Sequence, residues 1–346
     1  MNLKELSEKL GLSQTTVSRA LNGYPEVREA TRERVLDAAR RYNYSPNTRA
    51  KSLATGQSMA IGHVVPTSTT HEMVNPIFAD FTAGASQTYA RHGYEMVIST
   101  VPDGDEEKVY RKLKARGTVD GVLVHAPAMD DQRLSIIEDL GLPYAVHGRV
   151  SDRPEPYCWL DVNNRSAFRT ATDFLLDLGH RRIALVNGRE QMDFAYRRRS
   201  GYLDALEARR IAPDPQLMLS DEMTETFGYR SAMQLLALPR PPTAFLVSSM
   251  ISAIGVRRAA EENGLRLGTD LSVMTFDDDL SYLRNGGDIP IFTAMHSSVR
   301  EAGRLLAEML IELIANPDGP RRTLLLEAEL KVGRSTGPVP LAVRSA

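Results

Sequence analysis

From residue 59 onward, short apolar runs alternate with longer stretches of helical periodicity. The apolar runs include 60–65, 96–99, 122–125, 183–186, 244–247 and 272–276, and amphipathic patterns such as 77–92, 164–178 and 299–315 lie between them. Buried strands that alternate with helices form right-handed βαβ units and mostly parallel sheets. About 280 residues of this pattern exceed one comfortable core, so the sequence predicts two stacked α/β lobes. Ligands of such sheets bind outside the carboxyl ends of the strands, here in a cleft between the lobes.

A different pattern precedes this region, because the first 22 residues form two short amphipathic segments. Leu3, Leu6 and Leu10 recur at helical spacing and give the first segment an apolar face. Gly11 suits the positive φ that ends a helix, and Ser13 suits the cap of the next one. The sequence therefore predicts a helix pair with a tight polar turn.

The second of these segments, 14–21, presents polar side chains outward. We expect Val17, Ala20 and Leu21 to face inward, while the outward side chains are Gln14, Thr15, Ser18 and Arg19. An amide, hydroxyls and a guanidinium on a helix of this size suit the major groove of DNA. The local pattern also fits an ordinary surface helix hairpin.

A third helical pattern, 28–42, is predicted to complete a small three-helix head, with an apolar stripe of Val35, Leu36, Ala38, Ala39 and Tyr42. Residues 1–57 contain ten Lys or Arg and six Asp or Glu, a balance of +4, which leaves −6 on the rest of a chain whose net charge is −2. A basic head on an acidic body is expected when only the head meets phosphate. Pro46 favours the first turn of a short helix over 47–53, although a plain linker fits this stretch as well.

Composition and motifs argue against several other classes. The single cysteine, Cys158, rules out a disulfide framework within one chain, no secretory signal is visible, and no apolar run approaches the roughly 20 residues of a membrane helix. We therefore expect a cytoplasmic protein with no membrane association. The seven histidines lie far apart without metal-ligand spacing, and no P-loop is present. The run Asp277-Asp278-Asp279 fits a hydroxyl ligand or a helix cap better than a metal or glycosidase site, so we predict no catalysis, cofactor or metal.

Eight short motifs together resemble the lactose-repressor (LacI/GalR) family of bacterial transcription regulators. They are TVSRALN at 16–22, TRERV at 31–35, YSPN at 44–47, NPIF at 75–78, LGHRRI at 178–183, RRSGY at 198–202, FDD at 276–278 and GRST at 333–336. The resemblance covers essentially the whole chain. It implies a homodimer that reads a pseudo-palindromic double-stranded operator, and two lobes with the type I periplasmic-binding-protein fold.

The resemblance also implies domain boundaries and DNA contacts. The helix-turn-helix head spans 1–45, the hinge and linker 46–58, and the two-lobed domain 59–340, with the first lobe from about 59–162 and 293–322 and the second from about 163–292 and 323–340. Gln14, Thr15 and Arg19 are expected to read bases, and Arg19 suits guanine O6 and N7. The expected phosphate contacts are Thr16, Ser18, Asn22 and Tyr44. Residues from Asn47 to Leu53 become the hinge helix, with Leu53 as an apolar wedge in the minor groove.

For the effector cleft, the resemblance implies a set of residues drawn from both lobes. They are Asn75, Phe78, His125 and His147 in the first lobe and Arg198, Ser249 and Asp277 in the second. Arg198 and Asp277 are expected to hold sugar hydroxyls, and Phe78 to stack on a pyranose face. From the residues alone, Asp277 also fits a helix cap and His125 a hydrogen-bonded histidine at the cleft edge.

Three positions depart from the family pattern. Arg28 stands where a capping serine is usual, Asn163-Asn164 replaces Asp-Asn, and Ser249-Met250 replaces Asn-Asp. The segments around His147 and Ser249 are similar to the branch that senses α-glucosides and related oligosaccharides. We therefore expect a repressor of sugar catabolism or uptake genes that a small carbohydrate releases. The alternatives are a regulator with a purine or phosphoprotein co-repressor, a sugar-binding protein without a DNA role, and a sugar-processing enzyme.

Overall fold

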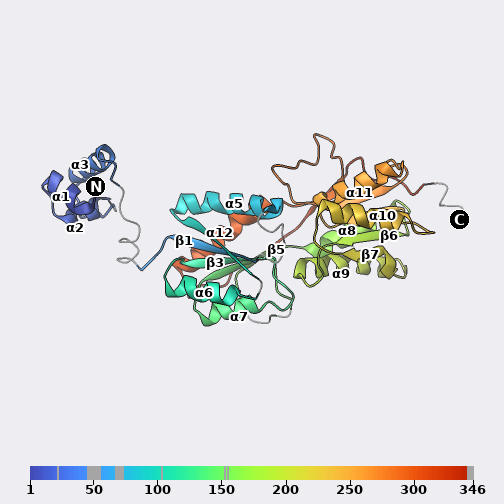
Figure 1. Cartoon of the computed structure of the whole chain (residues 1–346), viewed down its shortest axis with the longest axis horizontal. Helices are drawn as coiled ribbons and strands as arrows, with labels where there is room; N and C mark the ends of the chain where they lie inside the picture. The colour runs from blue at the N-terminus through green and yellow to red at the C-terminus, as the bar shows by residue number, and fades with distance from the viewer. Residues whose placement is uncertain are drawn as a thin grey trace. The chain divides into compact units, whose positions relative to one another are not determined.

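The computed structural model describes residues 1–21, 23–44, 56–66, 74–102, 104–151, 153 and 156–340 (Figure 1). The chain divides into two compact units, residues 1–59 together with 117–119, and the remainder from residue 60. The predicted hinge over 46–58 lies mostly outside the described residues, as do Asn22, Asn47 and Leu53.

The first unit contains the three predicted helices, α1 (Leu3–Leu10), α2 (Gln14–Leu21) and α3 (Glu29–Arg41). Gly11 ends α1 with a φ of 63°, and the Ser13 Oγ accepts a hydrogen bond of 3.0 Å from the Thr16 amide at the start of α2. Both predicted caps are therefore confirmed. The core of the unit consists of Leu6, Val17, Ala20, Val27, Val35, Ala38 and Ala39.

One face of the third helix differs from the prediction, whereas the expected lack of a side-chain cap at the start of the helix is confirmed. Leu36 and Tyr42 are exposed rather than part of the apolar stripe, and Tyr42 lies under the Lys9 ammonium, 4.9 Å from its ring centroid. Arg28 gives α3 no side-chain cap. The first turn of α3 is instead braced by Arg32, which pairs with Glu29 and donates to the Tyr24 carbonyl.

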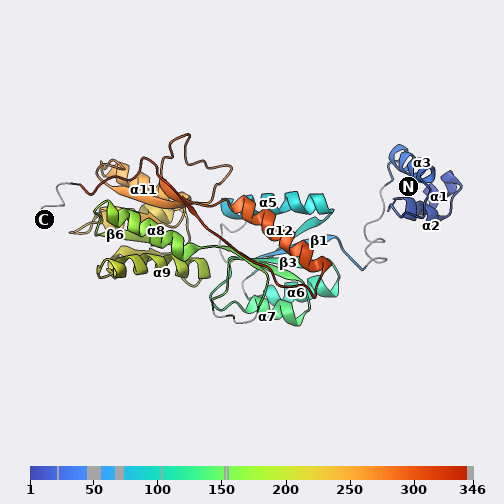
Figure 2. The ribbon, with the colours of Figure 1, turned by 180° about the vertical axis from the view of Figure 1, so that it is seen from behind.

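The second unit contains two six-stranded sheets, and the first has the strand order β11-β5-β4-β3-β1-β2. Its strands are β1 (Ala60–Pro66), β2 (Glu95–Val101), β3 (Gly121–His125), β4 (Tyr144–His147), β5 (Trp159–Val162) and β11 (Thr323–Leu326), and all their pairings are parallel. Helices α5 (Pro76–His92) and α12 (Val299–Ala315) cover one face, and α6 (Glu106–Ala115) and α7 (Gln132–Asp139) cover the other (Figures 1 and 2). We call this sheet and its helices the first lobe.

The second lobe is built in the same way around the strand order β12-β10-β9-β8-β6-β7. Its strands are β6 (Ile183–Asn187), β7 (Met218–Ser220), β8 (Ala244–Val247), β9 (Ser272–Asp277), β10 (Thr293–His296) and β12 (Glu329–Lys331), with only the β10–β12 pairing antiparallel among those described. A short 3₁₀ turn, Pro215–Leu217, precedes β7. The helices are α8 (Asn164–Asp177), α9 (Asp193–Ala208), α10 (Glu225–Leu236) and α11 (Met250–Glu262).

Side chains that alternate along the second sheet build two cores. Ile183 and Leu185 pack with α8 and α9, whereas Ala184 and Val186 pack with α10 and α11. This is the period of two that a strand buried on both faces requires. The two α/β lobes predicted from the apolar runs are therefore confirmed.

The boundaries between the lobes need a correction. Residues 293–322 were expected in the first lobe and 323–340 in the second. Instead, Thr293–His296 pairs with β9 in the second sheet, and Thr323–Leu326 pairs with β5 in the first. The chain therefore passes from the second lobe to the first, and back again, one strand later than expected. Hydrogen-bonded pairing decides to which sheet a strand belongs.

The close contact between α5 and α12 depends on two glycines. A Cβ on Gly84 would lie 1.9 Å from the Arg300 carbonyl oxygen, and one on Gly303 would lie 2.1 Å from that of Phe81. Only glycine permits this approach, which fixes α5 and its amino end at the mouth of the cleft. Among the described residues, no helix combines the length and apolar character that a membrane crossing requires.

Candidate DNA-reading face and effector cleft

In the first unit, α2 presents the side chains predicted to read DNA. Gln14, Thr15 and Arg19 are exposed, whereas Thr16 and Ser18 are half-buried. No acidic side chain in the described part of the chain forms an ion pair with Arg19. The guanidinium is therefore available to an acceptor outside the head.

Two of the predicted phosphate contacts also have structural roles in the head. The Thr16 hydroxyl lies 2.8 Å from the Ser13 Oγ at the start of α2. Tyr44 packs against the core of the head, and burial raises the pKa of its hydroxyl. Contact of either residue with phosphate stays a prediction.

In the second unit, a cavity of about 900 Å³ is lined by residues of both lobes. In the first lobe it lies at the carboxyl ends of parallel strands, where Pro66 ends β1, His125 ends β3 and His147 ends β4. Arg198 of α9 and Phe276 of β9 line it from the second lobe. This is the position that the sequence predicted for a ligand.

The wall formed by the first lobe is aromatic. His147 stacks on Phe81 with 4.4 Å between ring centroids, and His125 meets Phe78 and Phe81 edge to face at 5.2 and 4.9 Å. Asn75 lines the same wall, and its Oδ1 caps α5 by accepting from the Ile77 amide at 3.0 Å. Sequence reasoning found all of these residues except Phe81.

The histidines in this wall, His125 and His147, and His63 behind it are held in their neutral form. The His63 Nδ1 lies 3.0 Å from the His125 Nε2, and the His63 Nε2 lies 3.0 Å from the Tyr89 hydroxyl. Burial lowers the pKa of His63 and of His147 to about 4, and it lowers the pKa of His125 well below its usual value. At neutral pH this wall therefore offers hydrogen-bonding groups without charge.

Arg198 is the central cation of the opposite wall, although its side chain is only 6% exposed. It lies 4.2 Å over the Phe276 ring and donates from Nε to the Asn164 Oδ1 at 2.7 Å and from Nη1 to the Ser248 carbonyl. Burial lowers its pKa to about 10, so it remains charged at pH 7.

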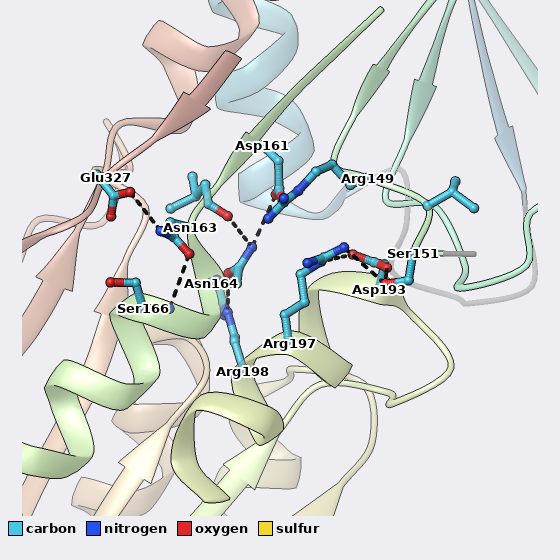
Figure 3. A network of polar contacts seen from close by, with 12 residues as sticks. Arg149, Ser151, Asp161, Asn163, Asn164, Ser166, Asp193, Arg197, Arg198 and Glu327 are labelled. Atoms are coloured by element: carbon cyan, nitrogen blue, oxygen red, sulfur yellow. Dashed lines mark hydrogen bonds and ion pairs between the residues drawn. The ribbon is translucent and has the colours of Figure 1, made fainter. Parts of the chain in front are cut away.

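A polar network joins the two lobes beside Arg198 (Figure 3). The Arg149 Nε donates to the Asp161 Oδ2 at 2.8 Å, and the Asn164 Nδ2 donates to the Asp161 Oδ1 at 3.2 Å. Asn164 thus connects a strand of the first lobe with Arg198 on a helix of the second.

A second link joins the lobes through one carboxylate. Asp193, at the start of α9, accepts from the Ser151 hydroxyl and from Arg197 (Figure 3). Its backbone amide donates to the Pro127 carbonyl at 3.1 Å. Movement of one lobe against the other would have to break these contacts.

Two of the predicted effector contacts lie elsewhere, which corrects the expected site. Ser249 and Asp277 are not among the described residues that line the cavity. The Ser249 Oγ caps α11 by accepting from the Ser252 amide at 3.2 Å, and the Asp277 Oδ1 accepts from the Asp279 amide at 2.9 Å. Both side chains are used within the backbone turns that follow strands β8 and β9.

In place of Asp277, the next residue along the chain, Asp278, lines the cavity from the second lobe, as do Asp221, Glu222 and Glu225. Burial and the neighbouring Asp277 raise the pKa of Asp278 to about 7. Sequence reasoning missed Asp278, and it also missed Asp161 and Asn164. The available signal was position, because ligands of parallel sheets bind at the carboxyl ends of the strands, where Asp161 and Asp278 lie.

Two observations concern metal binding and nucleophilic catalysis. The described residues hold no group of three or more His, Cys, Asp or Glu placed to bind a metal ion. The segment from Gly333 to Gly337 has the spacing of a nucleophile elbow, but Ser335 is 1% exposed, and its hydroxyl donates to the Val273 carbonyl and accepts from the Thr293 amide. That serine is a structural link and not a nucleophile.

Two family profiles match the chain. The one described as "Bacterial regulatory proteins, lacI family" matches residues 2–47, and the one described as "Periplasmic binding protein-like domain" matches residues 172–336. Among related proteins, the HTH-type transcriptional regulator AglR of Rhizobium meliloti (strain 1021) is 42% identical over 98% of this chain and 95% of its own length. The HTH-type transcriptional regulator RafR of Escherichia coli is 32% identical over 92% of this chain and 94% of its own length.

Solved structures agree with this grouping. A structure of the lac repressor dimer bound to operator and the anti-inducer ONPF is 27% identical, with a TM-score of 0.83 over 97% of this chain and 99% of that one. The transcriptional regulator CelR in complex with cellobiose is also 27% identical, with a TM-score of 0.72 over 97% of this chain and 99% of that one.

Proposed function

The chain belongs to the LacI family of DNA-binding bacterial transcriptional regulators, and we propose that it represses genes of sugar catabolism or uptake until a small carbohydrate releases it from its operator. The observation that carries the proposal is the composition of the cavity. One wall offers aromatic rings, which can stack on the face of a sugar ring. The other wall offers a buried arginine and a carboxylate, which can form hydrogen bonds with sugar hydroxyls.

Charge favours an uncharged ligand. Among the described lining residues, nine are acidic and only three are arginines. Asp131 is neutralised by Arg133, and the Asp161 carboxylate by Arg149, but the balance stays negative. A phosphorylated or carboxylated ligand would meet repulsion here, whereas a neutral oligosaccharide would not. CelR, a relative with the same architecture, has been solved with cellobiose.

On the DNA side, α2 provides the proposed reading face. Arg19 chelates a guanine and Gln14 pairs with an adenine, with Thr15 beside them. Thr16, Ser18, Asn22 and Tyr44 hold phosphates, and Asn47 to Leu53 form the hinge helix with Leu53 as the wedge. Two copies of the chain bind a pseudo-palindromic operator, as the lac repressor dimer does with its own operator. The proposed place of action is the cytoplasm, where bacterial DNA lies.

The proposed mechanism is a shift between two arrangements of the lobes. Sugar binding engages Arg198 and the aromatic wall together, and so favours one angle between the lobes. Operator DNA favours another angle through the hinge. The ligand acts only through its difference in affinity for these two states. The chain is a regulator in this account and catalyses no reaction.

The test begins with the full-length protein and an operator obtained by selection from random duplexes. Mobility-shift titrations then use maltose, sucrose, trehalose, raffinose and cellobiose, with adenosine and guanine as purine controls. We expect at least one sugar to weaken operator binding and Phe78→Ala to blunt that effect. If a purine instead tightens operator binding, the effector is a co-repressor and the inducer proposal is wrong. If no sugar changes the affinity, the carbohydrate proposal is wrong.

A further inference from the structure

Two buried side chains, Tyr89 on α5 and His63 on β1, form a hydrogen-bonded chain that ends at His125 in the aromatic wall. We propose that this chain fixes His125 in the tautomer that carries its proton on Nδ1, so that the cavity presents an N–H donor to a ligand oxygen. The ligand in question is that of the proposed function, but the tautomer is a property of the protein alone.

The direction of the chain is set at Tyr89. Its side chain is 1% exposed, and within the described part of the chain its hydroxyl has one hydrogen-bond partner, the His63 Nε2 at 3.0 Å. If His63 donated to Tyr89, the phenolic hydrogen would be buried with no acceptor, at the full cost of an unsatisfied donor. The Tyr89 hydroxyl therefore donates, and the His63 Nε2 accepts.

The direction of the hydrogen bond at Tyr89 determines which nitrogen of the His63 ring carries the proton. The His63 ring is fully buried, and burial lowers its pKa to about 4, so it is neutral at pH 7 and carries one ring proton. With Nε2 acting as the acceptor, that proton is on Nδ1. The His63 Nδ1 then donates to the His125 Nε2 over 3.0 Å.

At His125 the same argument places the ring proton on the nitrogen that does not bond to His63. The Nε2 accepts from His63, so the one proton of this neutral ring is on Nδ1. The described residues provide no hydrogen-bond partner for Nδ1, and the ring is half-buried in the lining of the cavity. Edge-to-face contacts with Phe78 and Phe81, and a 3.1 Å bond from Arg133 to the His125 carbonyl, hold the ring in place.

The consequence is a rule for the ligand. Opposite His125 it must offer an acceptor, such as a hydroxyl, ring or carbonyl oxygen, and an analogue with a bare carbon there binds less well. Tyr89 and His63 do not touch the ligand and act as positioning residues. Among the described residues, no hydrogen bond joins His147 to this chain, although its ring centroid lies 6.3 Å from that of His125.

The first test is nitrogen NMR on the ligand-free, full-length protein with ¹⁵N-labelled histidine. We expect a protonated Nδ1 and an unprotonated Nε2 on His125, assigned by comparison with His125→Asn. The opposite pattern, or protonation of both nitrogens at pH 7, would overturn the proposal.

The second test removes the Tyr89 hydroxyl, which sets the direction of the hydrogen bonds in this chain. Tyr89→Phe is expected to leave His125 as a mixture of tautomers, because nothing then biases His63. Tyr202→Phe is the matched control, since Tyr202 is another buried tyrosine whose hydroxyl donates a single bond, 2.9 Å to the Ile183 carbonyl in the second lobe. An unchanged pure tautomer in Tyr89→Phe would remove Tyr89 from the chain.

The third test measures the donor in binding. His125→Asn keeps an N–H near the place of Nδ1, and His125→Leu has a similar size without one. Calorimetry with maltose, sucrose, raffinose and cellobiose is expected to give about tenfold weaker binding for the leucine variant than for the asparagine variant. Equal affinities would contradict a donor role. If none of these sugars binds the wild-type protein, the carbohydrate proposal fails, while the NMR result still decides the tautomer.

Discussion

The Arg198 Nε donates to the Asn164 Oδ1 over 2.7 Å, and this bond places a cation that lines the cavity in direct contact with the segment where the chain crosses between the lobes. Asn164 is the first residue of α8, and it also donates to Asp161 on β5. A ligand that draws on Arg198 therefore acts on both lobes at once. This relationship is the physical basis on which we propose coupling between the cleft and the angle of the lobes.

Replacement of Arg198 by lysine is expected to abolish the sugar response while operator binding persists. A lysine keeps the charge but loses the planar guanidinium that packs over Phe276 and donates to both Asn164 and Ser248. Loss of these charge-assisted bonds costs about 1.5–3 kcal/mol of unfolding free energy. Urea denaturation and mobility shifts check both effects, with Arg199→Lys on the same helix as the control, since Arg199 is half-exposed and pairs with Glu190. A normal sugar response in Arg198→Lys would remove this residue from the proposed mechanism.

Acidification is expected to destabilise the second unit between about pH 6.5 and 4 through His63 and His147. The folded state lowers the pKa of His63 and His147 to about 4, so the unfolded chain binds more protons in this range and stability falls as pH falls. Asp278, with its pKa raised to about 7, acts in the opposite direction.

His147→Gln tests this because it removes one of these histidines. The unfolding free energy of this variant should fall less steeply between pH 6.5 and 4 than that of the wild type, when followed by fluorescence of Trp159, the single tryptophan. His92→Gln, at an exposed position, is the control. Parallel curves for His147→Gln and wild type would show that this ring does not contribute.

The head should become more stable when α3 receives the cap that it lacks. Arg28 makes no side-chain cap, and Arg28→Ser supplies a hydroxyl for the free amides of the first turn. The expected gain is about 1 kcal/mol. Hydrogen exchange of the α3 amides in the full-length protein measures it, and unchanged exchange would mean that the Arg32 contacts already serve as the cap.

Arg19 should decide part of the operator sequence. Arg19→Ala is expected to cost about 1–3 kcal/mol of binding free energy and to relax the preference for guanine at one position. Arg40→Ala on α3, where Arg40 pairs with Asp37, is the matched control. A selection experiment that returns the same site for wild type and Arg19→Ala would exclude base reading by this residue.

Local signals predicted most of the fold. The caps at Gly11 and Ser13 and the strands with helices between them follow from rules that act within a few residues. The assignment of Thr323–Leu326 to a sheet failed because pairing with β5 depends on residues 164 positions earlier. Helix and strand type are local properties, whereas sheet membership is not.

The residues of the cleft were likewise predicted only in part. Phe78, His125, His147 and Arg198 line the cavity as the resemblance implied, whereas Asp277 does not line it and its neighbour Asp278 does. The orientation of two adjacent side chains after a strand depends on the turn that follows it. The contact of His63 with Tyr89 carried no signal in the sequence, because β1 and α5 meet only in the folded lobe.

The reciprocity of the two binding events tests the central claim most directly. Operator affinity of the full-length protein is measured by fluorescence anisotropy with and without saturating sugar, and sugar affinity is measured by calorimetry with and without operator. The account predicts that each ligand weakens the other by the same factor, about 5- to 150-fold. A sugar that binds the free and the operator-bound protein equally well would contradict it.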